Sequence, residues 1–275
     1  MNKSSVDSQM PRRKISCSGK RAIKMDRWVN RVAVVTGASS GIGAEIAKDL
    51  TKSGMIVVGL ARRVERFDEL KSGLPDEQKN NFHGLKCDVM DEEEVAKTFA
   101  AIEEKFGGID VLVNNAGVYD PSMKLFQEGN SSKISETINT NITGFISCTR
   151  EAFKSMKKRS FPGHIINMNS ISGHNVPNLP TDYYFNVYAA TKHAITALTE
   201  TERQEFAKER LGIKVSSISP GICQTDLSPH FSKEALVSYP HLYPRDVSNA
   251  VLYVLGTPPH VQIQELTIKP IRVNS

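Results

Sequence analysis

The sequence has few cysteines, and no two of them lie close together. In 275 residues there are four, at Cys17, Cys87, Cys148 and Cys223. This wide spacing fits neither a disulfide framework nor a zinc knuckle, which needs closely spaced pairs of ligands. Scattered cysteines are typical of proteins from a reducing compartment. The sequence therefore predicts a cytoplasmic protein without a metal site.

Long apolar runs are also missing. The longest, such as Met55–Ala61, fall far below the roughly 18 residues that a membrane-spanning helix requires. The N-terminus has no apolar segment of the kind that a secretory signal contains. The sequence thus predicts neither a membrane span nor an export signal.

Most of the chain lacks an excess of either charge, although its formal net charge is +5. Residues 1–25 alone carry +6, because seven Lys and Arg side chains face one acid, Asp7, and the remainder carries −1. A basic face for nucleic acid is therefore not expected. The same stretch is Ser-rich and poor in apolar residues, which predicts a disordered basic extension. A mitochondrial presequence is the less favoured alternative, because no sustained amphipathic face is present.

From residue 26 onward, short β-branched runs alternate with longer helical ones. Strands are expected at 32–36, 56–60, 82–87, 111–114, 164–169, 214–219 and 261–268, and helices at 41–53, 63–72, 91–106, 133–158, 185–211 and 244–255. Several strands are apolar throughout, as expected when helices cover both faces of a sheet. The alternation predicts an α/β fold, a doubly wound Rossmann sheet of seven parallel strands flanked by helices. No linker divides residues 26–275, so a single domain is predicted.

A glycine-rich segment joins the first predicted strand to the first helix. It reads Thr36-Gly37-Ala38-Ser39-Ser40-Gly41-Ile42-Gly43. Glycines permit a tight turn and let the N–H groups of a helix N-terminus approach a pyrophosphate. Although the spacing differs from Gly-x-Gly-x-x-Gly, it predicts a dinucleotide site formed by Gly37, Ser39, Ser40, Gly41, Ile42 and Gly43.

The end of the second predicted strand indicates which dinucleotide binds. NAD-binding units usually carry an acid there, which binds the ribose 2′-hydroxyl. This chain has Arg62 and Arg63 instead. Two guanidinium groups without a carboxylate suit a 2′-phosphate, so NADP(H) is the predicted cofactor. The alternative is that both arginines only form a solvated helix N-terminus with Glu65.

A phenol and an ammonium group lie four residues apart in the predicted helix 185–211. Tyr188 and Lys192 therefore share a helix face, and none of the other six tyrosines has a lysine at this spacing. A phenol with a pKa near ~10 exchanges protons at neutral pH only if its anion is stabilised, as a nearby Lys⁺ can do. The pair predicts an acid/base centre, although a surface pair that merely supports the helix would have the same spacing.

The glycine-rich segment also fits a different chemistry. Gly37–Gly41 matches Gly-x-Ser-x-Gly, the nucleophile elbow of α/β-hydrolases, with Ser39 as the nucleophile. Several strands usually precede such an elbow, whereas one precedes Ser39, and the histidine would have to be His230, His241 or His260. A hydrolase also leaves Tyr188 and Lys192 unexplained, so the dinucleotide site is the favoured interpretation.

Four motifs, in this order, resemble those of the short-chain dehydrogenase/reductase family. They are Thr36–Gly43, Asn114-Asn115-Ala116-Gly117, Tyr188–Lys192 and Ser219-Pro220-Gly221. Met25–Trp28, Ser170–His174 and Val261–Pro270 are similar to segments of the insect farnesol dehydrogenases and of vertebrate relatives that reduce steroid ketones. The resemblance implies an NADP(H)-dependent oxidoreductase that interconverts a hydroxyl and a carbonyl on an apolar molecule such as farnesol. A steroid-like ketone is the alternative substrate, and a homodimer or homotetramer is the implied assembly.

The resemblance also implies roles for single residues. Tyr188 would be the catalytic acid/base, and Lys192 would lower its pKa and hold the nicotinamide ribose. Ser170 would bind the reacting oxygen, and Asn141 would anchor a water that relays protons to Lys192. Tyr188 would contact the cofactor as well as Lys192, and the remaining cofactor contacts would come from Asp88, Val89, Asn115, Pro220, Gly221 and Thr225.

Apolar side chains gather in three segments that we expect to line the substrate pocket. These are Gly173–Val187, Tyr119–Leu125 and the residues after Thr225, with Val176, Leu179, Tyr183, Tyr184, Phe185, Leu227 and Phe231. Their low charge favours an apolar substrate. A non-catalytic NADP(H)-binding regulatory protein would share the glycine loop, but it would not need Asn141, Ser170, Tyr188 and Lys192 together.

Overall fold

The computed structural model describes residues 25–177, 184–225 and 240–271. Nearly all of the predicted basic extension lies outside the described residues, so its disorder stays a prediction. The same holds for four of the expected substrate-wall residues, which are Leu179, Tyr183, Leu227 and Phe231.

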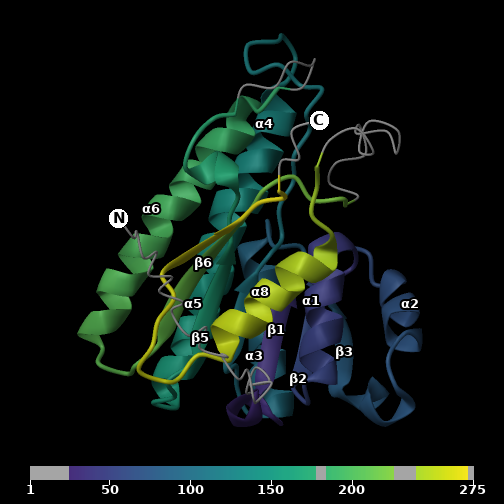
Figure 1. Cartoon of the computed structure of the whole chain (residues 1–275), viewed down its shortest axis with the longest axis vertical. Coiled ribbons are helices and arrows are strands. Elements are labelled where there is room, and N and C mark those ends of the chain that lie inside the picture. The colour runs from purple at the N-terminus through teal and green to yellow at the C-terminus, as the bar shows by residue number, and fades with distance from the viewer. Residues whose placement is uncertain (1–24, 178–183, 226–239, 272–275) are drawn as a thin grey trace, which may run out of the picture.

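Seven parallel strands form one sheet in the order β3-β2-β1-β4-β5-β6-β7. They are β1 (Val32–Thr36), β2 (Ile56–Ala61), β3 (Phe82–Lys86), β4 (Val111–Asn114), β5 (His164–Met168), β6 (Lys214–Pro220) and β7 (Glu265–Ile268). The chain moves outward from β1 to β3 and then returns to place β4 beside β1 (Figure 1). Such a reversal opens a crevice at the carboxyl ends of the two central strands. The predicted doubly wound sheet is confirmed.

Alternate side chains of the strands enter two hydrophobic cores, one on each face of the sheet. Ala33 and Val35 of β1 belong to the core with α1 (Gly41–Lys52), α2 (Arg66–Ser72) and α8 (Pro244–Leu255). Val32 and Val34 belong to the core with α3 (Glu92–Phe106), α5 (Phe145–Lys158) and α6 (Asn186–Lys208). Figure 1 shows α1 and α8 side by side on the first of these faces. Helices on both faces explain why β1 is apolar almost throughout.

Local signals fix some element boundaries well and others poorly. Asp91 caps α3 by accepting a hydrogen bond from the Glu94 N–H (3.0 Å), and Gly107 ends the helix at φ +81°. By contrast, α2 begins at Arg66 instead of 63, and β7 begins at Glu265 instead of 261. Before β7 the Val261 carbonyl accepts a hydrogen bond from Nζ of Lys214 (2.8 Å), the first residue of β6. This carbonyl therefore bonds a side chain of β6 instead of its backbone. Three short helices were not predicted, η1 (Asp26–Trp28), η2 (Asp76–Asn81) and η4 (Ile171–Gly173).

The predicted helix 133–158 is divided in two. A π-helical turn, η3 (Asn139–Gly144), separates α4 (Ser131–Ile138) from α5. At its end Gly144 lies so close to the neighbouring backbone that a Cβ would be 2.6 Å from the Val89 carbonyl oxygen. Turns of this kind occur frequently at functional sites, and this one contains Asn141.

None of the described helices is long and apolar enough to cross a membrane.

A buried carboxyl group lies between α6 and the sheet. Glu202 Oε2 accepts a hydrogen bond from Asn167 Nδ2 (2.7 Å), and Asn167 Oδ1 accepts one from Asn114 Nδ2 (3.1 Å). Burial raises the pKa of Glu202 to about 7, although hydrogen bonds from Asn167 and Thr149 oppose the rise. The ionised form of Glu202 is therefore a cost to the folded state.

We expect Glu202→Gln to stabilise the protein above pH 7 and to change little near pH 5. The Glu202 pKa is 4.5 without the fold and about 7 within it, so the wild-type chain loses stability as the pH rises between these values. The shift corresponds to about 3 kcal/mol. Urea unfolding at pH 5 and pH 8 measures this difference, with Glu104→Gln, an exposed glutamate of α3, as the control. An equal effect of Glu202→Gln at both pH values would contradict the prediction.

Candidate active site

Hydrogen bonds hold the glycine-rich loop against the end of β4. The backbone N–H groups of Asn115 and Ala116 both donate to Thr36 Oγ1 at 3.0 Å. The Asn115 side chain adds two more hydrogen bonds in the same direction, because its Nδ2 donates to the carbonyls of Thr36 (2.9 Å) and Gly37 (3.2 Å). Gly43 packs against the same group, and a Cβ there would lie 2.4 Å from Asn115 Nδ2. The loop after β1 is therefore fixed by the residues that follow β4.

The loop leaves the first turn of α1 open to a ligand. Gly37 and Gly41 adopt φ values of +65° and +56°, which other residues rarely adopt. Ser40 is the N-cap of α1, but its side chain makes no capping hydrogen bond. The N–H groups of this turn and the positive end of the helix dipole thus suit an anionic group such as a pyrophosphate.

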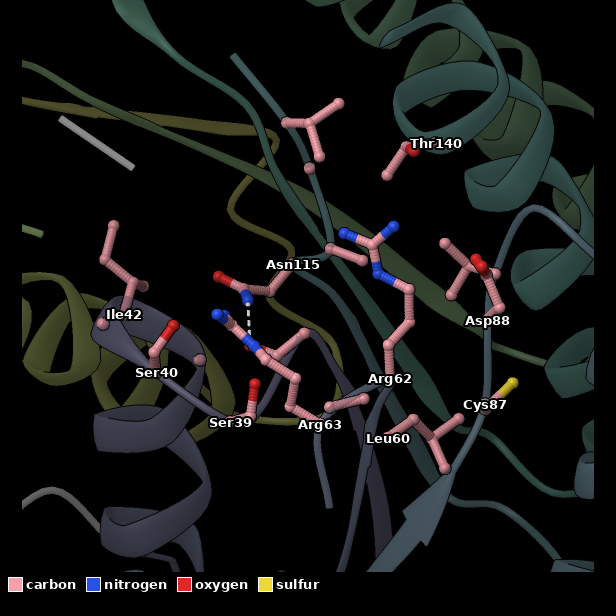
Figure 2. Close-up of a pocket in the computed structure, with 18 of the residues that line it drawn as sticks. Ser39, Ser40, Ile42, Leu60, Arg62, Arg63, Cys87, Asp88, Asn115 and Thr140 are labelled. Atoms are coloured by element: carbon pink, nitrogen blue, oxygen red, sulfur yellow. Dashed lines mark hydrogen bonds between the residues drawn. The ribbon is translucent and has the colours of Figure 1, made fainter. Parts of the chain in front are cut away.

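A pocket lies over this loop, between the ends of β1, β2, β3 and β4. Figure 2 shows Arg62 and Arg63 leaving the end of β2 in different directions, with Arg63 turned toward Ser40 and Arg62 toward Thr140. Twelve predicted cofactor residues line the pocket: Gly37, Ser39, Ser40, Gly41, Ile42, Gly43, Arg62, Arg63, Asp88, Val89, Asn115 and Thr225. Seven further lining residues were not predicted: Leu60, Ala61, Cys87, Ala116, Gly117, Val118 and Thr140. Most of them adjoin predicted ones in the sequence, which is the signal that could have found them.

The pocket suits a nicotinamide dinucleotide better than a hydrolase site. Its arginines and open helix N-terminus match the phosphates of such a cofactor. No histidine is among the described residues that line it, so Ser39 has no base there. Within the described chain, no three His, Cys, Asp or Glu side chains converge as a metal site would require.

Pro220 and Gly221 lie apart from the described lining of this pocket. Pro220 ends β6, and the Gly221 N–H donates to the Ile268 carbonyl of β7 (2.8 Å). The chain then continues to Thr225, whose side chain would be 3.3 Å from a Cβ placed on Gly41. This segment therefore reaches the pocket through Thr225.

Tyr188, Lys192 and Ser170 come together at the carboxyl end of β5. Lys192 Nζ lies 5.7 Å from the centroid of the Tyr188 ring and donates to the Met168 carbonyl (2.8 Å), the last residue of β5. Ser170 follows two residues later, and its hydroxyl forms a hydrogen bond with that of Tyr188. Both Tyr188 and Lys192 are only 8% exposed, so this pair is not the surface pair that the spacing also allowed.

Burial changes the proton affinity of both side chains. It raises the pKa of Tyr188 to about 12, against the effect of the hydrogen bond with Ser170. It lowers the pKa of Lys192 to about 8. In the free protein burial therefore raises the pKa of the phenol instead of lowering it, and the lowering of this pKa by Lys192 stays a prediction. At neutral pH the phenol carries its proton, and most of the lysine is charged.

Asn141 connects the segment after β4 to the helix that carries Tyr188. Its Oδ1 accepts from the Val118 N–H (2.8 Å), and its Nδ2 donates to the Val118 carbonyl (3.0 Å) and to Thr191 Oγ1 (3.1 Å). Thr191 Oγ1 in turn donates to the Tyr188 carbonyl (2.7 Å). The side-chain amide of Asn141 is thus used within the protein, and the water relay stays a prediction.

Asn186 is a site residue that the sequence reasoning missed. It begins α6 at φ +39°, and its Oδ1 accepts a hydrogen bond from the Tyr188 N–H (3.0 Å). Its Nδ2 donates to the carbonyls of Asp120 (2.8 Å), Tyr184 (3.0 Å) and Met123 (3.1 Å). An asparagine two residues before the tyrosine was the available signal, because asparagine tolerates positive φ and binds nearby backbone.

The described substrate-wall residues fall into two groups. Tyr119 lies beside the candidate centre, with its ring 4.5 Å from that of Tyr188 and its hydroxyl donating to the Tyr184 carbonyl (3.2 Å). Val176, Tyr184 and Phe185 line an apolar groove whose described lining includes neither Ser170 nor Tyr188. Phe185 connects the two groups, because its ring stacks on that of Tyr119 (6.1 Å between centroids).

Known proteins share both the sequence and the fold. The family described as short chain dehydrogenase matches residues 31–235. Farnesol dehydrogenase of Aedes aegypti is 51% identical over 249 residues, which cover 90% of this chain and 98% of that protein. Dehydrogenase/reductase SDR family member 11 of Bos taurus is 42% identical, with coverages of 90% and 98%.

A solved structure gives the same result in three dimensions. The crystal structure of a short chain dehydrogenase from Burkholderia cenocepacia in complex with NADP superposes with a TM-score of 0.78 at 26% identity, over 89% of this chain and 98% of that one. The order of the motifs, the strand order of the sheet and these likenesses agree, and the chain belongs to the short chain dehydrogenase family of oxidoreductases.

Proposed function

We propose that this protein is an NADP(H)-dependent dehydrogenase that interconverts a terpenoid alcohol such as farnesol with its carbonyl product. The observation that carries the proposal is the meeting of Ser170, Tyr188 and Lys192 at the end of β5, the second strand from the β1 glycine loop. The high identity to a protein named farnesol dehydrogenase supports the substrate class.

The proposed proton chemistry follows from the two hydroxyl groups. A bound nicotinamide cofactor supplies or accepts the hydride. In the reducing direction, the phenol of Tyr188 gives its proton to the carbonyl oxygen, while the Ser170 hydroxyl donates a hydrogen bond to the same oxygen. In the oxidising direction, the phenolate form of Tyr188 takes the proton of the alcohol and becomes the phenol. This anion has to form before the alcohol is oxidised, and the Lys192 ammonium beside the ring is placed to stabilise it.

The cofactor preference rests on the residues that would meet the adenosine ribose. Arg62 and Arg63 line the pocket, and charged hydrogen bonds to a 2′-phosphate favour NADP(H) over NAD(H). Asp88 also lines the pocket. One of its carboxylate oxygens is already used within the chain, because it accepts a hydrogen bond from the Met90 N–H (3.0 Å). The structure of a family member with NADP supports the same preference.

The proposal includes a homodimer or homotetramer in the cytoplasm. Exposed apolar side chains on two neighbouring helices, Ile138 of α4 and Ile146 of α5, support assembly. Sedimentation velocity of the purified chain would measure its state, and a monomer at micromolar concentration would refute this part.

With farnesol and NADP⁺, the purified protein should produce reduced cofactor, which its absorbance measures. NADP⁺ should be preferred over NAD⁺ by about tenfold or more in kcat/KM, because hydrogen bonds to a charged group contribute about 1.5 kcal/mol or more. A panel of steroid ketones with NADPH is the comparison. Turnover of these ketones without turnover of farnesol would move the substrate assignment to the second class.

We expect Tyr188→Phe to lower kcat by about 10² to 10⁴-fold, the usual contribution of a general acid or base. The dissociation constant for NADPH should change less than about twofold, because the ring and its packing remain. Tyr119→Phe is the matched control, since Tyr119 contacts the same ring. Unchanged turnover of Tyr188→Phe would remove the phenol from the mechanism, and a wild-type protein that binds NADPH without any turnover would favour the regulatory alternative.

Asn186→Gly should lower kcat by about tenfold, because small displacements of reacting groups are costly. Glycine adopts φ +39° without strain, so the change removes only the hydrogen bonds to Tyr188, Asp120, Met123 and Tyr184. Asn186→Asp retains the acceptor for the Tyr188 N–H but turns a second acceptor toward the carbonyls of Asp120, Met123 and Tyr184, so it should also lower kcat. Steady-state kinetics of both variants measure the effect, and a normal kcat in Asn186→Gly would show that Tyr188 needs no such support.

A further inference from the structure

Arg62 forms an ion pair with an acid on the opposite side of the candidate cofactor pocket. Its Nη1 lies 3.6 Å from Oε1 of Glu136, which belongs to α4. Glu136 is one helical turn before Thr140, and Thr140 lines the pocket together with Arg62. Figure 2 shows the Arg62 side chain extended toward Thr140, whereas Arg63 turns the other way. The ion pair therefore joins the end of β2 to the helix across the pocket.

This ion pair is weak enough to exchange partners. The side chains of Arg62 and Glu136 are 54% and 45% exposed, and pairs in contact with water contribute at most about 1 kcal/mol. Lys133, in the same helix, forms its ion pair with Asp120, and Glu136 acts on it as a further charge that raises its pKa. Among the described residues, Arg62 is the ion-pair partner of Glu136.

We propose that Glu136 competes with the 2′-phosphate of the cofactor for the Arg62 guanidinium, and so limits how strongly the chain prefers NADP(H) to NAD(H). The inference rests on the proposed cofactor. A 2′-phosphate that binds Arg62 either displaces Glu136 or shares the guanidinium with it. In both cases a carboxylate remains within a Debye length of the phosphate and repels it. NAD(H) has a neutral hydroxyl at this position, so the charge of Glu136 acts mainly on the binding of NADP(H).

Removing the charge of Glu136 should therefore strengthen the binding of NADPH. For Glu136→Gln we expect the dissociation constant of NADPH to fall about threefold, which corresponds to an exposed ion pair. The constant for NADH should change less than about 1.5-fold on the same basis. Titration of the fluorescence of each reduced cofactor measures both constants without any turnover. Glu93→Gln is the matched control, because Glu93 is an exposed glutamate of α3 that pairs with Lys97.

Two further measurements separate competition from other effects of the substitution. In an Arg62→Gln background, Glu136→Gln should no longer change the affinity for NADPH, because the pair acts through Arg62. The gain in the wild-type background should also shrink between low and high salt, since the charges are screened.

Weaker NADPH binding by Glu136→Gln would overturn the inference, because the acid would then be orienting Arg62 for the phosphate. An unchanged NADPH constant, or an equal gain for NADH, would overturn it as well. These results differ from a failure of the proposed cofactor, in which the wild-type chain would not bind NADPH, and they do not depend on which substrate is turned over.

Discussion

The hydrogen bonds between the carboxyl ends of β1, β4 and β5 are the constraint on which the rest of the site depends. Thr36, Asn115 and Gly37 join the loop after β1 to the chain after β4, and Asn114 and Asn167 join β4 to β5. Parallel strands give such a row of polar groups only at one edge of the sheet. The glycine loop and the Ser170 turn leave the sheet at this edge, so the candidate cofactor pocket and the acid/base centre become neighbours.

Burial near these strand ends destabilises the charged forms of side chains in two places. Tyr188 and Lys192 are desolvated, which raises the pKa of the phenol and lowers that of the amine. Glu202 is desolvated below them, at the far end of the Asn114 and Asn167 hydrogen bonds. Poorly solvated polar groups of this kind interact strongly with charges that develop beside them. In the proposed reaction, the same burial that destabilises the charged forms of Tyr188 and Lys192 would strengthen their interaction with a substrate oxygen that gains charge.

The sequence predicted the sheet, the glycine-rich loop and the Tyr188–Lys192 pair because these follow local rules, whereas the roles of Ser170, Asn141 and the remaining cofactor contacts were implied by the family resemblance. Apolar strands, helix caps such as Asp91, and the spacing of Tyr188 and Lys192 can all be read over a few residues. What it missed depends on contacts between distant segments. The π-turn at Asn139–Gly144 goes with the close approach of Gly144 to Val89, and the raised pKa of Tyr188 arises from its burial in the folded chain. The ion pair of Arg62 with Glu136 likewise joins residues that no local pattern connects.

The most direct test of the account is a crystal structure of the chain with NADP⁺ and an unreactive analogue of the alcohol. The account predicts that the analogue's oxygen lies within hydrogen-bond distance of both the Tyr188 and the Ser170 hydroxyls, with the attached carbon facing the nicotinamide ring. An oxygen bound elsewhere, with the phenol turned away from the nicotinamide, would contradict it.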